Sequence, residues 1–350
     1  MLDFGGAIEV FTTCPQSKDV PEGYLRRALE VSVWSDAAGC AGMLIYTDNS
    51  IVDPWLVAQM VLQGTRRLCP LVAVQPVYMH PYAAAKMVAS LGAMHGRRIC
   101  LNMLAGGFRN DLIALGDTTP HDERYARTIE YARIMRGLLE SEGPVTFEGR
   151  YYTVRGLRMT PELPAELAPG FLISGSSEAG RAAALAIGAT AVEYPKPATE
   201  LETDKGAPAG LRRGVRIGII AREDAEEAWR IAWARFPEDR RGRLANALAM
   251  HVSDSVWHRQ LSQLAQRTAA QGDVYWLWPF ENYKTFCPYL VGDYGRVADE
   301  VARYLRLGYS TFILDIPSEA EDLETASVVF RSALERAGGS LAPAGSRASA

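Results

Sequence analysis

The strongest candidate for chemistry is the tetrapeptide Ser-Gly-Ser-Ser at 174–177, which separates a short apolar segment from a helical pattern. Small residues in such a turn leave backbone N–H groups free at the start of a helix, and the serine hydroxyls add further donors. Together these groups can bind an anion such as a phosphate. A serine that only caps the helix would give the same pattern, so both interpretations stay open.

Other polar side chains stand where a ligand would need them. His121 and Tyr125 belong to the stretch HDERY at the start of a predicted helix, where helix capping plus a surface ion pair is the alternative. Asn102 interrupts an apolar run, and a buried amide must find partners in a ligand or in a neighbouring loop. Thr47 and Gln75 each end a predicted strand. Side chains at the ends of parallel barrel strands meet at one face, so all five are candidates for one site.

These residues need a scaffold of alternating strands and helices, as right-handed βαβ units provide. The predicted strands cover 8–13, 42–47, 68–75, 98–104, 170–174, 189–194, 215–221 and 311–316. The predicted helices cover 23–38, 54–62, 81–94, 122–140, 178–187, 224–236 and 319–337. The strands are continuously apolar and therefore buried on both faces, which predicts a (β/α)₈ barrel. A doubly wound sheet is the alternative, but it rarely needs so many units.

Two stretches interrupt the alternation. Segment 195–214 is rich in proline and glycine and fits no helix of useful length, and 240–293 is an insertion before the last strand. The first part of the insertion, 243–271, has a helical pattern, and its aromatic second part forms either a lid or a core. We therefore expect a single barrel domain over 1–337 and a disordered tail over 338–350.

Composition excludes several classes of function. The chain has 37 Lys and Arg against 41 Asp and Glu, a net charge of −4 and no basic stripe, so no nucleic-acid partner is expected. It shows neither a signal-peptide pattern nor an apolar run of membrane-spanning length, which favours a cytoplasmic protein without a membrane partner. The histidine and cysteine spacing gives no metal site, and the five cysteines are expected to be reduced and buried.

Nine segments, in this order, resemble the luciferase-like flavin-dependent monooxygenases of the bacterial luciferase type, most closely the alkanesulfonate monooxygenase branch. The match covers nearly the whole chain, and the segments are specific jointly rather than singly. They are DPWLVAQM (53–60), LCPLVAVQP (68–76), HPYAAAKMVASL (80–91), GRRICLNMLAGG (96–107), HDERY (121–125), FEGRYYTVRG (147–156), LISGSSEAG (172–180), AREDAEEAW (221–229) and LVGDYGRVADEVARYLRLGYSTFIL (290–314).

The resemblance implies a (β/α)₈ TIM barrel that binds reduced FMN loosely and uses O₂ as cosubstrate. The flavin would come from a separate NAD(P)H:flavin reductase, and the protein would form a homodimer or homotetramer. The flavin phosphate would lie on the serine-rich turn, and the ring would meet a few polar groups in an apolar mouth. The implied cofactor-binding residues are Thr47, Gln75, Asn102, His121, Tyr125, Gly175, Ser176 and Ser177.

Several positions depart from the alkanesulfonate branch. Ile51 stands where that branch has a cysteine, Gln75 where it has an arginine, and Gly218 where it has a histidine. Arg216 keeps a family arginine, whereas the family's mobile-loop arginine falls near Tyr283 or Lys284. A sulfonate would lack partners in such a mouth, so we expect an apolar or aromatic substrate instead.

The sequence therefore predicts a two-component FMNH₂-dependent monooxygenase that oxygenates a small biosynthetic intermediate through a C4a-(hydro)peroxyflavin. Arg216 and His121 are the predicted catalytic residues, and hydroxylation, Baeyer–Villiger oxidation and desulfonation remain open. The alternatives are an alkanesulfonate-type monooxygenase, a deazaflavin-dependent oxidoreductase of the same superfamily and a non-catalytic flavin-binding protein. The predicted substrate-binding residues are Phe11, Ile51, Trp276, Trp278 and Tyr283.

Overall fold

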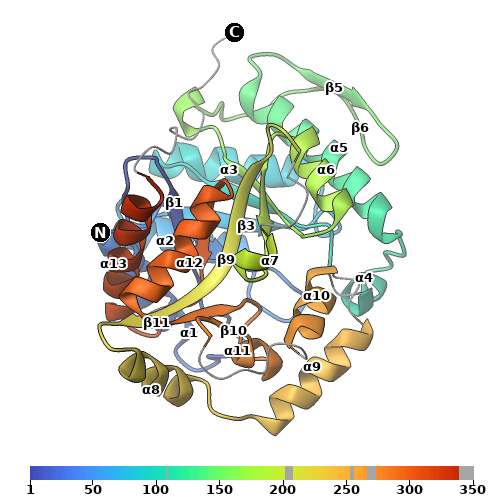
Figure 1. Ribbon diagram of the computed structural model, residues 1–350. Helices are drawn as coiled ribbons and strands as arrows, with labels where there is room; N and C mark the ends of the chain where they lie inside the picture. The colour runs from blue at the N-terminus through green and yellow to red at the C-terminus, as the bar shows by residue number, and fades with distance from the viewer. Residues whose placement is uncertain (108, 202–207, 253–255, 266–272, 339–350) are drawn as a thin grey trace.

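Eight apolar strands close into a parallel barrel in the computed structural model, which describes residues 1–338 except 108, 202–207, 253–255 and 266–272 (Figure 1). The barrel strands are β1 (Glu9–Thr13), β2 (Gly42–Ile45), β3 (Cys69–Val74), β4 (Cys100–Met103), β7 (Phe171–Ser174), β8 (Thr190–Glu193), β9 (Arg212–Arg222) and β12 (Tyr309–Leu314). Their order is β9–β12–β1–β2–β3–β4–β7–β8, and pairing of β8 with β9 closes the ring. The predicted fold class is confirmed, and each barrel strand overlaps a predicted one.

Large side chains fill the inside of the barrel, so it is a core and not a channel. Gly42 allows this packing, because an added Cβ would lie 2.2 Å from the Cys69 carbonyl oxygen and 2.8 Å from the Phe11 ring. The packed interior consists of Phe11, Leu44, Leu71, Cys100, Leu172, Val192 and Ile313.

Helices cover the outside of the barrel, and a second core lies between them and the strands. They are α1 (Tyr24–Ala38), α2 (Pro54–Gly64), α3 (Pro81–His95), α5 (His121–Glu140), α6 (Glu178–Ala186), α12 (Tyr294–Arg306) and α13 (Glu321–Arg336). Local sequence sets where they begin. Helix α2, for example, starts with Pro54 after Asp53, whose carboxylate accepts the Trp55 N–H at 2.9 Å.

Short elements between the barrel strands were not predicted. Two of them form an antiparallel hairpin after α5, and the side chains of that hairpin are largely exposed, so no apolar run marked it. Segment 195–214 holds one short described helix, while 202–207 lie outside the described residues. The short elements are α4 (Arg109–Ala114), β5 (Val145–Glu148), β6 (Thr153–Leu157), η1 (Ala165–Leu167) and α7 (Ala198–Leu201).

Strand β9 is the longest strand and leaves the barrel at its carboxyl end. Its first part pairs with β8 and β12, and 218–222 pair with β11 (Tyr289–Asp293). Strand β10 (Tyr275–Trp276) extends this small sheet, and α8 (Ala225–Arg235) packs on β9 and β11. The helix predicted at 224–236 therefore covers the extension. The barrel helix of this unit is α12, which packs against α13 and was not predicted.

The rest of the insertion is helical. The helical pattern at 243–271 corresponds to α9 (Arg240–Val252) and α10 (Val256–Ala265), and α11 (Trp278–Glu281) follows. Parts of that pattern, and the predicted tail beyond Gly338, lie outside the described residues. All five cysteines are free, and four of them are buried. Within the described ranges no helix is long and apolar enough to cross a membrane.

Candidate active site

A cavity of about 380 Å³ opens at the carboxyl end of the barrel strands, the face at which parallel barrels hold their sites. Strand ends and the loops after them form most of its wall, and residues of α4, α5 and the insertion complete it. Many of the predicted site residues line it. These are Thr47, Gln75, Asn102, His121, Tyr125, Gly175, Ser176, Ser177, Arg216 and Tyr283.

The turn between β7 and α6 forms one wall of the cavity. Gly175 has a φ of +156°, and an added Cβ would lie 2.6 Å from Tyr125 Oη, so only glycine fits. Ser177 caps α6, because its Oγ accepts the Gly180 N–H at 3.0 Å. Ser176 Oγ is buried and has no hydrogen-bond partner among the described residues. Ser177 thus fills the capping role, whereas the Ser176 hydroxyl, without a partner among the described residues, lies at the positive end of α6.

His121 and Tyr125 lie beside the β7–α6 turn, one helical turn apart at the start of α5. Tyr125 is hydrogen-bonded to Ser177; burial raises the pKa of its hydroxyl, and this hydrogen bond opposes the rise. The His121 ring packs edge-on against Tyr125, with 5.3 Å between ring centroids. His121 Nδ1 lies 2.7 Å from Asp122 Oδ1, so one ring nitrogen is already engaged.

The strand ends next to the turn carry the predicted amide and hydroxyl groups. Asn102 is buried on β4, and its Oδ1 accepts the Ser174 hydroxyl at 2.9 Å. The partner of this buried amide is therefore a neighbouring strand end. Gln75, at the end of β3, is buried, and Thr47, after β2, is half-buried. These groups reach the cavity from three successive strands, as the barrel register requires.

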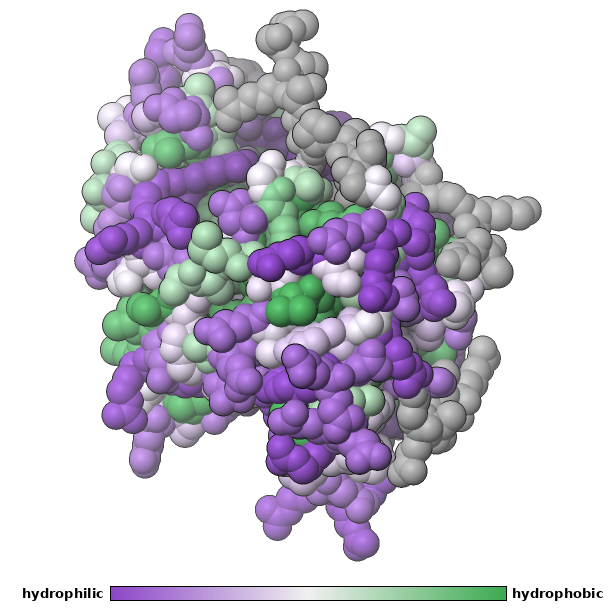
Figure 2. Space-filling model, turned by 60° about the vertical axis from the view of Figure 1, so that its left-hand side comes forward, coloured by the Kyte–Doolittle hydropathy of each residue, from purple (hydrophilic) through white to green (hydrophobic). Residues whose placement is uncertain are grey.

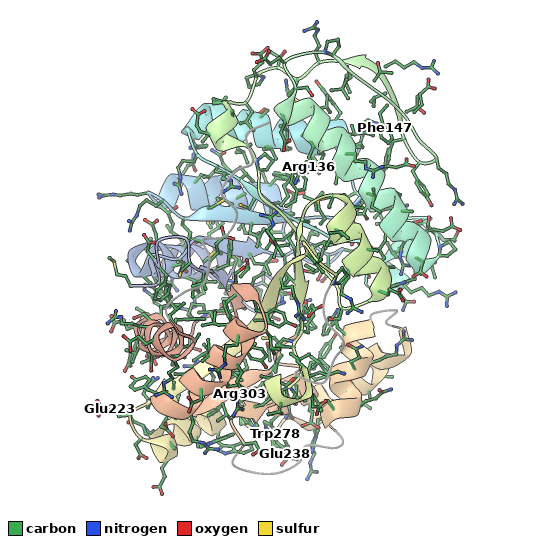
Figure 3. All side chains as sticks on the ribbon, turned by 45° about the horizontal axis from the view of Figure 1, so that its top comes forward. Arg136, Phe147, Glu223, Glu238, Trp278 and Arg303 are labelled. Carbon is green, nitrogen blue, oxygen red and sulfur yellow. The ribbon has the colours of Figure 1, made fainter. Side chains whose placement is uncertain are left out.

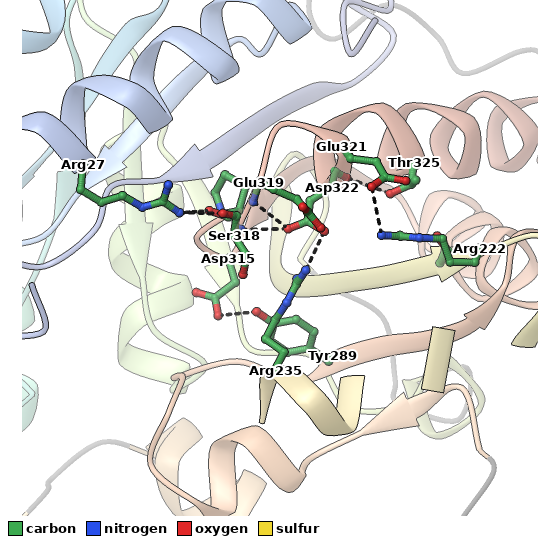
Figure 4. A network of polar contacts seen from close by, with 12 residues as sticks. Arg27, Arg222, Arg235, Tyr289, Asp315, Ser318, Glu319, Glu321, Asp322 and Thr325 are labelled. Carbon is green, nitrogen blue, oxygen red and sulfur yellow. Dashed lines mark hydrogen bonds and ion pairs between the residues drawn. The ribbon is translucent and has the colours of Figure 1, made fainter. Parts of the chain in front are cut away.

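Arg216 brings a buried cation into the cavity from β9. It is 2% exposed, its guanidinium lies 4.8 Å from the centre of the Tyr46 ring, and it pairs with Asp315 at 3.3 Å. Asp315 also accepts the Thr285 hydroxyl at 2.5 Å and the Tyr289 hydroxyl at 2.9 Å (Figure 4 draws the second contact). Burial and the charge of Asp315 hold the pKa of Tyr289 well above its ordinary value. Arg216 Nε is buried without a partner among the described residues.

The rim of the cavity carries charges that the sequence did not single out. Lys18 Nζ lies 3.3 Å from Asp48. Burial raises the pKa of Asp111, and the charge of Asp48 adds to the rise. Burial, helped by both carboxylates, raises the pKa of Tyr78 to about 12. Tyr283 has a φ of +54°, a strained backbone for a bulky side chain, and it also faces these carboxylates.

Four of the predicted substrate-binding residues do not line the cavity. Phe11 belongs to the packed interior of the barrel, and Ile51 lies partly buried in the loop after β2. Trp276 and Trp278 pack on Trp233 of α8, with ring centroids 5.0 and 5.4 Å apart. The two tryptophans therefore cover the β9–β11 extension.

The position of Trp278 can be followed in Figure 3. It lies near Glu238 in the insertion, at the opposite end of that view from Phe147 of the β5–β6 hairpin. Its indole N–H donates to the Phe236 carbonyl at 3.1 Å, and the Arg243 guanidinium lies 5.7 Å from its ring. The core interpretation of the aromatic segment therefore describes Trp278 best.

Sequence reasoning missed several residues that line the cavity or hold it. Tyr46, Tyr194 and Asp315 follow β2, β8 and β12, so the rule that found Thr47 could have found them. Trp257 comes from the helical part of the insertion, and no sequence pattern placed it over the barrel. Phe286 belongs to the aromatic part, for which a lid was one of the two alternatives. Trp257 stacks on Tyr194 with 3.9 Å between ring centroids and 16° between planes. Within the described ranges no group of three or more His, Cys, Asp or Glu could hold a metal ion.

Comparison with known proteins identifies the family. The sequence profile of the luciferase-like monooxygenases matches residues 8–311. One relative, the 4-(gamma-L-glutamylamino)butanoyl-[BtrI acyl-carrier protein] monooxygenase BtrO of Niallia circulans, is 36% identical over 303 residues, which cover 85% of this chain and 89% of BtrO. The chain therefore belongs to the luciferase-like monooxygenase family, as the sequence predicted.

Solved structures share the fold. The oxygenating constituent of 3,6-diketocamphane monooxygenase from Pseudomonas putida, a type II Baeyer–Villiger monooxygenase in complex with FMN, has a TM-score of 0.65 and 15% identity over 93% of this chain and 97% of its own. An F420-dependent secondary alcohol dehydrogenase with an F420–acetone adduct has a TM-score of 0.64 and 17% identity over 93% of this chain and 99% of its own. Two different cofactors thus occur on one fold, and the likeness shows the fold alone.

Proposed function

We propose that the chain is the FMNH₂-dependent oxygenase component of a two-component system and that it oxygenates an acyl group carried as a thioester. The observation that carries the cofactor assignment is Ser176, a buried hydroxyl without a described partner at the start of α6. Beside it, Gly175 leaves a space that any Cβ would fill. A phosphate fits both features, because it accepts hydrogen bonds and favours the positive end of a helix.

We assign different residues of the cavity to different parts of the cofactor. Reduced FMN, when bound, supplies the electrons that activate O₂ for the transfer of one oxygen atom. The β7–α6 turn binds the phosphate, and Arg181 holds this turn in place: it donates to the Ser176 carbonyl at 3.1 Å and pairs with Glu193 at 3.7 Å. The residues that would contact the flavin ring in this assignment are Thr47, Gln75, Asn102, His121 and Tyr125, all of which line the cavity.

Arg216 is the residue that we assign to the reacting centre. It is a buried cation whose orientation is fixed by Asp315, so it can stabilise negative charge that develops in the cavity without reorganising. His121 is a binding residue first, since Asp122 already engages one of its ring nitrogens. Trp257 and Phe286 exclude water from the same space, which favours oxygen transfer over loss of H₂O₂.

The proposed substrate is polar rather than apolar or aromatic. BtrO is named for an acyl group with a free amino acid end, bound to a carrier protein. Lys18, Asp48 and Asp111 place both signs of charge at the rim, where the ammonium and carboxylate of such a group would find partners. The tryptophans that suggested an aromatic substrate lie outside the cavity.

A deazaflavin-dependent hydride transfer is the second candidate, favoured by the likeness to the F420-dependent dehydrogenase. The two candidates differ in their use of oxygen, because only the monooxygenase consumes O₂ in proportion to its product. Rapid mixing of the enzyme and reduced FMN with O₂, with and without an acyl thioester, measures that proportion. Product formed without O₂ would overturn the monooxygenase.

The phosphate assignment has its own test. Ser176→Ala should weaken anaerobic binding of reduced FMN about tenfold, since a hydrogen bond to a charged group is worth about 1.5–3 kcal/mol. Binding of reduced riboflavin, which has no phosphate, should stay the same. An equal loss for both flavins would place the phosphate elsewhere.

We further propose a separate NAD(P)H:flavin reductase and a homodimeric or homotetrameric assembly. Helix α1 exposes Leu25, Leu29 and Val33, four residues apart along one face, and α2 exposes Leu56. Figure 2, which turns the side of α13 toward the viewer, shows further hydrophobic patches between hydrophilic ones. Sedimentation at two protein concentrations tests the assembly, and a monomer at both would contradict it.

A further inference from the structure

Helix α9 presents an apolar ridge to solvent. Leu244 and Leu248 are 63% and 61% exposed, and Arg240 precedes them on the same face because the three residues are spaced by four. Arg241 is exposed beside them. The helix sequence contains three arginines and no acidic residue. Among the described residues Arg243 pairs with Glu238, and no ion pair joins Arg240 or Arg241 to another residue.

Contacts at the start of α9 connect this helix to a segment that lines the cavity. The N–H of Asp239 donates to Asn282 Oδ1 at 2.9 Å, and Lys284 pairs with the Asp239 carboxylate at 2.5 Å. Asn282 and Lys284 belong to the loop at 282–286, and Tyr283 and Phe286 of the same loop line the cavity. Figure 1 shows α9 next to α10, the helix that supplies Trp257 to the cavity, at the end of the molecule that also carries α8 and α11.

The ridge thus combines two exposed leucines with the charges of Arg240 and Arg241, whereas the third arginine of α9, Arg243, pairs with Glu238. It belongs to the insertion that also supplies part of the cavity wall. The chain as a whole carries a net charge of −4, so an acidic partner is repelled except where positive charge is concentrated. An acyl-carrier protein is a small acidic helical protein that holds its acyl chain on a long flexible arm. It needs an apolar contact with a basic flank, close enough to the cavity for the arm to enter.

We propose that the ridge formed by Arg240, Arg241, Leu244 and Leu248 is the docking surface for the acyl-carrier protein that delivers the thioester to the cavity. This inference rests on the proposed function, and it adds the partner and the place where the partner binds. The arginines steer the acidic carrier and the leucines form the centre of the contact. The acyl arm then passes the loop at 282–286 to reach Arg216.

The test compares one acyl group on two carriers. The probes are 4-(γ-L-glutamylamino)butanoyl on the BtrI acyl-carrier protein and the same group on pantetheine. Arg240→Glu with Arg241→Glu, and separately Leu244→Ser with Leu248→Ser, should raise KM for the carrier-bound probe about tenfold or more. The kcat/KM for the pantetheine thioester should not change.

A matched control is the pair Arg66 and Arg67, which is also adjacent and exposed but lies before β3 at the opposite end of the barrel. Arg66→Glu with Arg67→Glu should leave both probes unaffected. Equal KM values for wild type and the α9 variants with the carrier would overturn the docking surface.

A direct binding measurement distinguishes a failure of the docking surface from a failure of the proposed function. Carrier binding is measured by the NMR chemical-shift changes of the carrier's amides. If the wild type oxidises neither thioester, the substrate proposal fails. Carrier binding that the α9 variants lose would still support the surface, and carrier binding that they retain would overturn it.

Discussion

The two walls of the cavity are held in place by different means. The wall made by the β7–α6 turn and the strand ends is fixed by backbone pairing around the barrel, so its side chains have little freedom to shift. The opposite wall consists of Trp257, Tyr283 and Phe286, which reach the cavity from the insertion. Side-chain contacts hold it, such as the stack of Trp257 on Tyr194. A rigid wall suits a cofactor, and a wall built on inserted elements suits a substrate.

The largest expected effect comes from a substitution at Gly175, where the β7–α6 turn packs closely against Tyr125. Gly175→Ala places a methyl group 2.6 Å from Tyr125 Oη at a φ of +156°, so the turn or the tyrosine must move. A displaced turn loses more than one hydrogen bond to the phosphate, each worth about 1.5–3 kcal/mol, so we expect at least about a 100-fold loss in affinity for reduced FMN. Anaerobic fluorescence titration measures it.

Gly188→Ala is the control for backbone strain. Gly188 lies just after α6 with a φ of +60°, and an added Cβ would meet nothing within 4 Å. Its variant should lose about 1–2 kcal/mol of stability and bind FMN as the wild type does. Wild-type FMN affinity in Gly175→Ala would show that the phosphate lies elsewhere.

The next effect concerns Arg216 and Asp315, which connect the two walls. Arg216→Met leaves a buried carboxylate without its cation, so we expect about 3 kcal/mol lower stability and a kcat about 100-fold lower. Adding Asp315→Asn should recover much of the free energy of unfolding and none of the kcat. Urea unfolding and product formation per O₂ measure the two quantities. Recovery of kcat in the double variant would show that Arg216 acts only through stability.

The difference between the walls also explains what the sequence could predict. The strands and the turn at 174–177 follow local rules, because burial on both faces makes strands apolar and ligands meet strand ends. Arg216 follows no such rule, and only the family resemblance identified it. The insertion obeys no such rule. Its tryptophans are typical of a lid, yet Trp276 covers the β9–β11 extension, and the less conspicuous Trp257 reaches the cavity. Only tertiary packing distinguishes the two, and a single sequence does not encode it locally.

A smaller effect tests the substrate wall directly. Trp257→Leu removes the stack on Tyr194, worth about 1 kcal/mol, and opens the cavity to water. The fraction of reduced flavin lost as H₂O₂ should rise about fivefold while FMN affinity stays unchanged. Trp233→Leu, in the aromatic cluster on α8, should lower stability without changing that fraction. If Trp257→Leu lost the same fraction of reduced flavin as H₂O₂ as the wild type, the insertion would not be part of the wall that excludes water.

The smallest expected effect is a pH dependence of the local stability of α10, the helix that supplies Trp257 to the same wall. His258 of α10 is buried between Trp257 and Phe280, neither ring nitrogen has a partner among the described residues, and burial lowers its pKa from 6.5 to about 4. The imidazole therefore stays neutral in the folded protein below pH 6.5, while the unfolded chain binds a proton. Its stabilisation is complete above pH 6.5 and declines as the pH falls toward 4. Hydrogen exchange of α10 should accelerate over that interval.

His258→Phe should abolish this pH dependence. The control variant His95→Gln, at a half-buried histidine bonded to Gln59, should leave it unchanged. A dependence unchanged in His258→Phe would assign the acid sensitivity of this wall to other groups.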